Sequence, residues 1–177
     1  MIDSATAATR RNALLPAGLS GIALAVIGGL GWLAGVPWLL PSLGPTLAIQ
    51  TGTPLHASAQ MRNVAFGHAI GLAAGLLAVY LTGAAHQPAV MDMVKDTLSL
   101  ERIAACVIAV ALSLAVQHRL NLMHPPAEAT TLIVALGGIE PTAAGALTVV
   151  AAIALVAALG EAARRLSAQA PALATSD

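Results

Sequence analysis

Two histidines and one glutamate stand among apolar residues in this sequence, and they are the side chains best suited to chemistry. His68 follows the pair Arg62-Asn63 in an apolar segment, and Glu128 comes four residues after His124. Residues four apart share one face of a helix. An imidazole beside a carboxylate can relay a proton or tune the charge of a binding site. The alternative is a pair that satisfies itself at the start of a helix.

Prolines with polar neighbours predict two helix starts close to these residues. Pro41-Ser42-Leu43-Gly44-Pro45-Thr46 can be laid on Pro125-Pro126-Ala127-Glu128-Ala129-Thr130, with Pro first and Thr five residues later in both. Pro is favoured at the first helical position and Ser at the N-cap. A helix that starts inside a membrane directs N–H groups and partial positive charge inward, which suits an anion. Glu128 brings an opposing charge, and prolines that merely turn the chain are the alternative.

The composition places these residues in a membrane protein. Of the 177 residues, 58% are hydrophobic and only 9% are charged, whereas a soluble domain carries about 25% charged residues. Aromatic residues make up 2% of the chain and 16 residues are Gly, as expected for helices that pack closely in lipid. Eight basic residues balance eight acidic ones, so the sequence offers no basic surface for nucleic acid.

Apolar segments predict four membrane helices, at 14–35, 64–83, 103–116 and 142–160. The third is short for a bilayer core, so its flanking Arg side chains are expected to reach the interface. Two further apolar segments, 39–51 and 127–138, are too short to span as helices and are expected to be interrupted or re-entrant. The expected tails are a cytoplasmic segment 1–12 and a frayed segment 166–177.

The two short segments occupy matching places and suggest a two-fold internal repeat, although chance similarity is an alternative. Four crossings would make the halves parallel and six would make them inverted; the shortness of the segments favours four. In either case six of the eight Lys and Arg residues share the side of both termini. The excess of positive charge predicts that both termini are cytoplasmic.

Glycines repeat every four residues at Gly67, Gly71 and Gly75. Such a face of small residues lets another helix approach closely. Gly21, Ala25 and Gly29 form a similar pattern in the first segment. These glycines are expected to serve packing and not chemistry.

Three blocks of the sequence resemble the HPP family of integral membrane proteins, which is named for its His-Pro-Pro triplet. The blocks are 41–46, then Arg62-Asn63-Val64 with Gly67-His68, then His124-Pro125-Pro126 with 129–134, and the resemblance covers about 39–139. It implies four transmembrane helices and a transport role, and some plastid and cyanobacterial members are associated with nitrite transport. The family pattern falls on Pro41, Gly44, Arg62, Asn63, Gly67, His68, His124, Pro125, Pro126, Ala129 and Thr130.

The sequence departs from the family pattern at two positions. Met61 stands where the family usually has Pro, and Glu128 stands where it usually has Gly. A carboxylate in this motif puts anion transport in doubt. It could indicate proton coupling, a cationic substrate or a different subfamily.

Together these observations predict an all-α membrane protein with a single transmembrane domain, 1–177, in a bacterial inner membrane. The expected function is a small transporter or channel-like permease, working as a homo-oligomer, for a small inorganic solute such as nitrite. A non-transporting anchor, sensor or assembly subunit is the alternative. No catalytic residue, metal or cofactor is predicted. The predicted solute-binding residues are Ser42, Gly44, Thr46, Arg62, Asn63, His68, His124, Glu128 and Thr130; the predicted structural ones are Pro41, Pro45, Gly67, Gly71, Gly75, Pro125 and Pro126.

Overall fold

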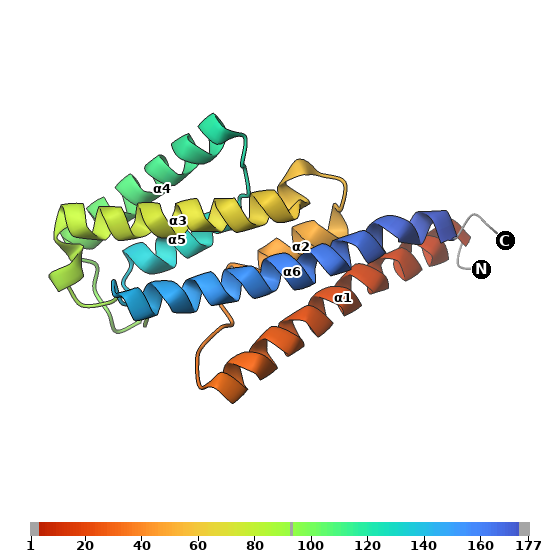
Figure 1. The fold of residues 1–177 in the computed structure, drawn as a ribbon, viewed down its shortest axis with the longest axis horizontal. Helices are drawn as coiled ribbons and strands as arrows, with labels where there is room; N and C mark the ends of the chain where they lie inside the picture. Colours follow the sequence, from red (N-terminus) through yellow and green to blue (C-terminus); the bar gives the residue numbers. More distant parts are fainter. Residues whose placement is uncertain (1–3, 93, 174–177) are drawn as a thin grey trace.

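The described chain is all-helical, as the composition predicts. The structure is a computed structural model that describes the backbone of residues 4–92 and 94–173 and the side chains of 14–92 and 94–169. This part of the chain contains six α-helices and two short 3-10 helices, and Figure 1 labels the α-helices. They are α1 (Ser4–Ala34), α2 (Leu43–Gly52), η1 (Ala57–Ala59), α3 (Met61–Thr82), η2 (Ala84–His86), α4 (Leu100–Leu120), α5 (Ala127–Ala135) and α6 (Ala143–Leu173).

Four of the helices are long and apolar enough to cross a membrane, and they match the four predicted ones. Their candidate spans are Leu14–Ala34, Met61–Thr82, Leu100–Leu120 and Ala143–Gln169. The third is 21 residues long, longer than the predicted 103–116, because the helix continues through polar residues at both ends. α6 also continues to Leu173, so the predicted tail is helical up to that residue, and 174–177 lie outside the described part.

Arg102, expected to reach the membrane interface, is instead buried at 4% exposure. Its guanidinium donates to the carbonyls of Gln87 at 2.7 Å, Pro88 at 3.2 Å and Ala135 at 2.9 Å. These carbonyls lie where the chain leaves helical geometry and lack a helical partner. Arg102 therefore joins the start of α4 to the end of α5, which explains its inward orientation.

The segment that contains α5 passes from one end of α3 to the other. Near one end, Asn63 Nδ2 donates to the carbonyl of Met123; near the other, the hydroxyl of Tyr80 donates to the carbonyl of Pro141. Asn63 and Tyr80 are about 26 Å apart along a helix that rises 1.5 Å per residue. The re-entrant alternative is therefore wrong for this segment, and α5 is the helical part of an interrupted crossing.

α2 is interrupted in the same way. Leu39, before the helix, packs against Gly28 of α1, and Thr51 at its far end pairs with Ser20 of α1. α2 therefore runs antiparallel to α1 and carries the chain back across the bundle. The missing length is supplied by the non-helical residues 37–40, because extended chain rises more than twice as far per residue as helix. The chain makes six crossings of the bundle, where the sequence favoured four.

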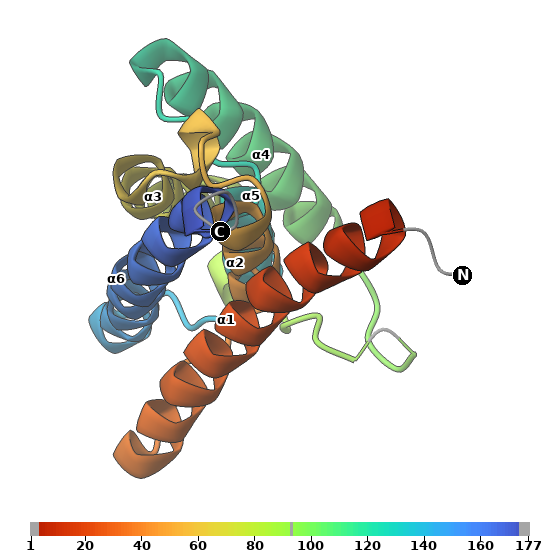
Figure 2. The same ribbon diagram turned by 90° about the vertical axis from the view of Figure 1, so that its right-hand side faces the viewer.

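The six helices form two groups of three. One group is α3, α4 and α5, the other is α1, α2 and α6, and α3 and α6 pack together between them. Figure 2 places α2 and α5 at the centre of the bundle, with the long helices around them. Apolar residues of α1, α2 and α6, including Ile27, Leu47 and Val156, pack in one core with residues of α3 and α5, including Val64 and Val134.

The glycine face on α3 packs directly against α5. Cβ atoms added at Gly67, Gly71 and Gly75 would lie 2.5–2.9 Å from side-chain atoms on or just before α5. This confirms the predicted close packing of small residues. Cβ atoms added at Gly21 or Gly29 would meet nothing within 4 Å, so the similar face on α1 is open in this chain.

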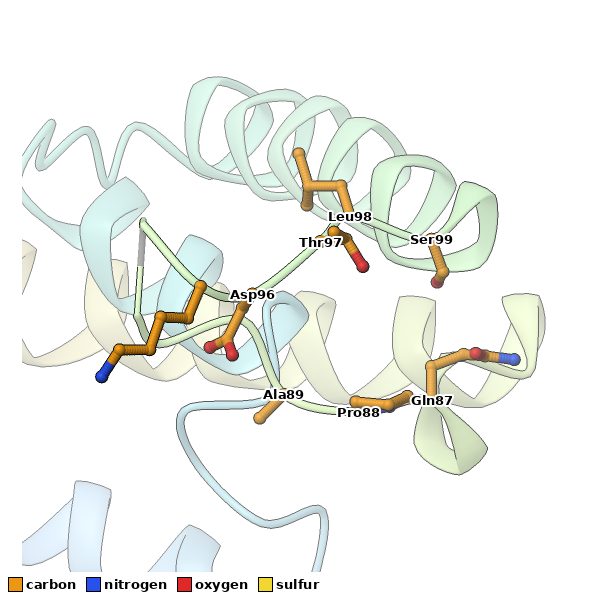
Figure 3. A pocket seen from close by; sticks show the side chains of 8 residues that line it. Gln87, Pro88, Ala89, Asp96, Thr97, Leu98 and Ser99 are labelled. Atoms are coloured by element: carbon orange, nitrogen blue, oxygen red, sulfur yellow. The ribbon is translucent and has the colours of Figure 1, made fainter.

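An open pocket of about 370 Å³ lies at one end of the bundle, between α3 and α4 (Figure 3). Its walls come from residues 87–89 and 95–99 and include none of the predicted solute-binding residues. The N–H groups of Asp92 and Met91 donate to Asp96 Oδ2 at 2.7 and 2.8 Å. These bonds hold the pKa of the Asp96 carboxyl below its usual value and keep the loop turned beside the pocket.

The α3–α5 contact predicts that Gly71→Ala destabilises the fold. The new Cβ would lie 2.5 Å from Thr131 Oγ1 and 3.0 Å from the carbonyl oxygen of Ala127, and overpacking of this kind costs about 1–3 kcal/mol. The matched control is Gly52→Ala in α2, because a Cβ added there meets nothing within 4 Å. Thermal unfolding in detergent, followed by circular dichroism, measures both, and equal melting temperatures would contradict the packing argument.

Candidate functional site

Polar side chains gather where the first turns of α2 and α5 overlap at the centre of the bundle. The hydroxyl oxygens of Ser42 and Thr130 are 2.8 Å apart, and Thr46 Oγ1 lies 3.1 Å from His124 Nε2. The two helices start beside each other and run in opposite directions. Their N-terminal turns therefore share one site, which is the arrangement that the two proline segments predict.

His68 joins the two helices from α3. Its Nε2 lies 3.0 Å from Thr46 Oγ1, and its Nδ1 lies 2.8 Å from Thr130 Oγ1. The centroids of the His68 and His124 rings are 5.0 Å apart. Ser42, Thr46, His68, His124 and Thr130 therefore form one hydrogen-bonded set, called here the two-histidine cluster.

The two-histidine cluster is closed to solvent. His68, His124, Thr46 and Thr130 are each 0% exposed, and Ser42 is 1% exposed. Burying a polar group without a hydrogen bond costs several kcal/mol, and every member of the cluster has a partner within it. The cluster is thus a set of buried polar groups that are hydrogen-bonded to one another inside an apolar bundle.

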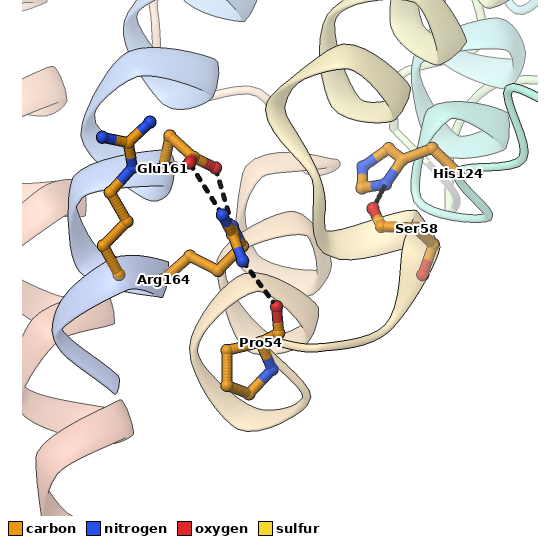
Figure 4. A network of polar contacts seen from close by, with 6 residues as sticks. Pro54, Ser58, His124, Glu161 and Arg164 are labelled. Carbon is orange, nitrogen blue, oxygen red and sulfur yellow. Dashed lines mark hydrogen bonds and ion pairs between the residues drawn. The ribbon is translucent and has the colours of Figure 1, made fainter. Parts of the chain in front are cut away.

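Two further bonds fix the ring of His124. Its Nδ1 lies 2.8 Å from the carbonyl oxygen of Ser58 (Figure 4), and its backbone N–H donates to Gln117 Oε1 at 3.0 Å. Because α5 begins at Ala127, His124 belongs to the turn before the helix. Contacts from α4 and from the loop before α3 thereby set the direction of the ring.

Glu128 is not paired with His124, contrary to the expectation that the two residues share a helix face. Its Oε1 accepts hydrogen bonds from Ser113 Oγ at 2.9 Å and Gln117 Nε2 at 2.7 Å. Its Oε2 is buried without a hydrogen-bond partner among the described residues. The expectation is wrong because His124 precedes the helix, and Gln117 bridges the two residues instead.

The sequence reasoning did not identify Ser113 and Gln117. Both are fully buried, at 0% exposure, and both contact Glu128. They are polar residues four apart in an apolar span, a spacing that places them on one helix face. That spacing was the signal available in the sequence.

The other predicted residues lie outside the two-histidine cluster. Arg62 and Gly44 are exposed, while Asn63 is buried. Asn63 donates to the carbonyl of Met123 and thereby holds the turn that carries His124. Arg62 stands at the start of α3, a position suited to anchoring at the interface.

The first amides of α5 are already bonded. The N–H groups of Ala127, Glu128 and Ala129 donate to the carbonyls of the residues three positions earlier, at 2.9–3.2 Å. The expectation that this helix start offers free N–H groups to an anion is therefore wrong for these three amides. The donors of the cluster itself are hydroxyl and imidazole groups.

A charged cluster on α6 fixes the loop after α2. Glu161 accepts hydrogen bonds from Arg164 and Arg165, and Arg164 also donates to the carbonyl of Pro54 at 2.8 Å (Figure 4). One carboxylate, that of Glu161, thus pairs with two guanidinium groups at this end of the helix. It joins α6 to the segment that contains Ser58 and so supports the position of His124.

Four long apolar helices with two interrupted ones around a buried polar junction define a multi-pass integral membrane protein. A family model described as "HPP, transmembrane region" matches residues 5–169. The chain belongs to the HPP transmembrane family, as the three sequence blocks imply. No curated protein and no solved structure matches the chain.

The closed cluster predicts that Thr130→Val destabilises the protein. The substitution removes the hydroxyl that Ser42 and His68 share and leaves buried polar atoms without a partner, which costs about 1–3 kcal/mol. The control is Thr148→Val, because the hydroxyl of Thr148 bonds only to the carbonyl of Ala144 in its own helix. Denaturant unfolding in detergent compares the two, and equal losses would show that the cluster contributes no particular stability.

Proposed function

We propose that this protein is a small transporter or channel-like permease for a small solute. The observation that carries the proposal is the closed two-histidine cluster at the meeting point of two interrupted helices. Interrupted helices that meet at mid-depth are where secondary transporters bind their substrates and coupling ions. Ionisable residues inside a membrane are costly and mark pathways for ions or substrates.

The arrangement supports a site that alternates between states. The cluster is closed on all sides in this structure, so a solute could enter only after helices move apart. Non-helical backbone at membrane depth is tolerated only when protein or a water-filled cavity covers it. Residues 37–40 and 122–124 are non-helical. The first segment leads to Ser42 and the second ends at His124, so such a cavity would form next to the cluster.

For the solute, a small inorganic anion is the first candidate and nitrite the compound to test first. Hydroxyl and imidazole N–H groups can donate to an anion. Two observations weigh against an anion: Glu128 lies nearby, and the first amides of α5 are occupied. A small cation is therefore the second candidate, and no cofactor is needed for either.

The distribution of charge supports an orientation in a bacterial inner membrane. α1 begins and α6 ends at the same end of the bundle (Figure 1). With six crossings, the ends of helices on this side carry six basic residues, and the other side carries Lys95 and Arg102. The positive-inside rule places this end, and with it both termini, in the cytoplasm. The basic residues of this end are Arg10, Arg11, Arg62, Arg119, Arg164 and Arg165.

The open glycine face of α1 supports assembly into a homo-oligomer. Little of the candidate span Leu14–Ala34 is buried within the chain, 17% of its most apolar 18 residues, and Gly21 and Gly29 leave space for another helix. We expect native mass spectrometry of the detergent-purified protein to give a multimer mass. A mass of one chain at all protein concentrations would contradict this assembly.

Uptake into proteoliposomes tests the transport function. We expect vesicles that contain the protein to accumulate nitrite faster than empty vesicles. His68→Ala and His124→Ala should lower the rate at least about tenfold, as expected for loss of positioned site groups, while Thr148→Val, which changes only a bond within α6, leaves it unchanged. Size-exclusion chromatography of each variant checks that it is folded.

The alternative function is a non-transporting anchor, sensor or assembly subunit, which the tight α3–α5 packing would also serve. It predicts that the histidine variants stay functional in cells while Gly71→Leu does not. If the folded protein moves neither nitrite nor any other small anion or cation, transport is wrong and this alternative takes its place.

A further inference from the structure

The side-chain amide of Gln50 is buried in α2 without a hydrogen bond. The residue is 0% exposed, and neither its oxygen nor its nitrogen has a partner among the described residues. Burying an amide without a compensating hydrogen bond is costly, and nearly all buried polar groups in proteins are paired. The amide of Gln50 therefore lowers the stability of the fold, in contrast to the fully bonded two-histidine cluster.

Gln50 lies one helical turn from the two-histidine cluster. It comes four residues after Thr46 in α2, so the two side chains share a helix face and lie about 6 Å apart along the axis. α2 runs from the centre of the bundle toward the end that carries both termini, where the carbonyl of Pro54 accepts from Arg164 of α6. Gln50 thus lies between the cluster and the end of the bundle that the charge distribution assigns to the cytoplasm.

A glycine of α6 makes room for the amide. A Cβ added at Gly160 would lie 2.9 Å from Gln50 Nε2 and closer still to Cδ and Oε1. Any larger residue at this position of α6 would displace the Gln50 side chain from its present place. The contact between α2 and α6 therefore accommodates a polar group that forms no hydrogen bond there.

The other short helix makes the same kind of contact without a polar group. With the two proline segments aligned, Gln50 of α2 falls on Val134 of α5. Val134 is 1% exposed and packs against a glycine of the neighbouring long helix, since a Cβ added at Gly75 would lie 2.9 Å from Val134 Cβ. An apolar side chain therefore suffices for packing at this place, and the amide at position 50 is not needed for it.

The chemistry of the amide and its surroundings suits a small anion. Nε2 of Gln50 carries two N–H donors and no charge, and α2 contains no acidic residue. Glu161, which follows Gly160 in α6, is paired with both Arg164 and Arg165, so this group has a net positive charge. A positive group at the end of the bundle beyond Gln50 attracts anions.

We propose that Gln50 is a second binding residue for the anion, on its way between the two-histidine cluster and the cytoplasm. This role rests on the proposed transport function. When the two groups of helices part, the Gln50 side chain rotates about its own bonds toward the gap, because it shares a helix face with Thr46. Nε2 then donates to the anion. The lack of a partner in the closed state keeps the amide available, since no bond has to break before the anion binds.

Gln50→Met removes the amide and keeps the length of the side chain. Because the amide has no partner in the closed state, we expect the melting temperature to rise by about 2–4 °C, opposite in sign to the loss of stability expected for Thr130→Val. A residue that only supports the fold would lose stability on this change. Thermal unfolding of the full-length protein in detergent, followed by circular dichroism, measures the shift.

Nitrite uptake into proteoliposomes by the same variant tests the binding role. Gln50→Met should lower the initial rate about three- to tenfold, as expected for loss of one hydrogen bond to the anion. Leu47→Met is the matched control, because it places Met at another fully buried position of α2 and exchanges one apolar side chain for another. The control should leave the uptake rate unchanged.

Three results would overturn the role of Gln50 while the proposed function stands. These are a wild-type uptake rate for Gln50→Met, an equal loss of rate for Leu47→Met, or a melting temperature of Gln50→Met at or below that of the wild type, which would mean that the amide is bonded within the fold. Uptake of cations alone by the wild type would contradict an anion at Gln50. If wild-type vesicles take up no small ion at all, the proposed function itself is wrong, and the role of Gln50 with it.

Discussion

Mutual satisfaction of two broken helices is the constraint on which this structure depends. A helix that begins inside an apolar bundle brings polar side chains and backbone groups to a place without water. α2 and α5 begin beside each other, and the polar groups of one first turn bond to those of the other. Each interrupted helix alone would leave buried polar groups without hydrogen-bond partners, which is costly. The pair of breaks is tolerated because His68 from a third helix completes the bonding.

The neighbouring helices are shaped by the same constraint. α5 can reach His68 only because α3 presents glycine at three successive contact positions, which brings the two backbones together. The turn before α5 is held by side chains of Asn63 and Gln117. Contacts within the chain thus set the positions of the two imidazole rings.

Much of this fold was predictable, because it follows from where apolar residues start and stop. The four long helices, the two short ones and the glycine face of α3 all have periodic or compositional signals. The number of crossings had no such signal, since residues 37–40 and 122–124 cross part of the bundle without helical structure. Their extended length could not be read from hydrophobicity. Helix α4 was underestimated because its ends are polar, and Arg102 was misplaced because its carbonyl partners come from distant segments.

The residues of the site could be predicted from the sequence, but the hydrogen bonds between them could not. His68, His124, Thr46, Thr130 and Ser42 were identified as candidates by their unusual setting. Sequence spacing suggested a His124–Glu128 pair that the structure replaces with a bridge through Gln117. Spacing predicts neighbours only within a regular helix, and His124 lies in a turn. Contacts between elements that are distant in sequence cannot be predicted from spacing and are seen only in the three-dimensional structure.

The grouping of helices has a mechanical consequence. Ser42 and Thr46 belong to the group of α1, α2 and α6, whereas His68 and Thr130 belong to the group of α3, α4 and α5. If the groups rotated apart as rigid bodies, three hydrogen-bond contacts of the cluster would break: Ser42–Thr130, Thr46–His68 and Thr46–His124. The His68–Thr130 bond would survive on one wall of the opened gap. Such a motion would open and close the contact between the two groups at the hydroxyl groups of Ser42, Thr46 and Thr130.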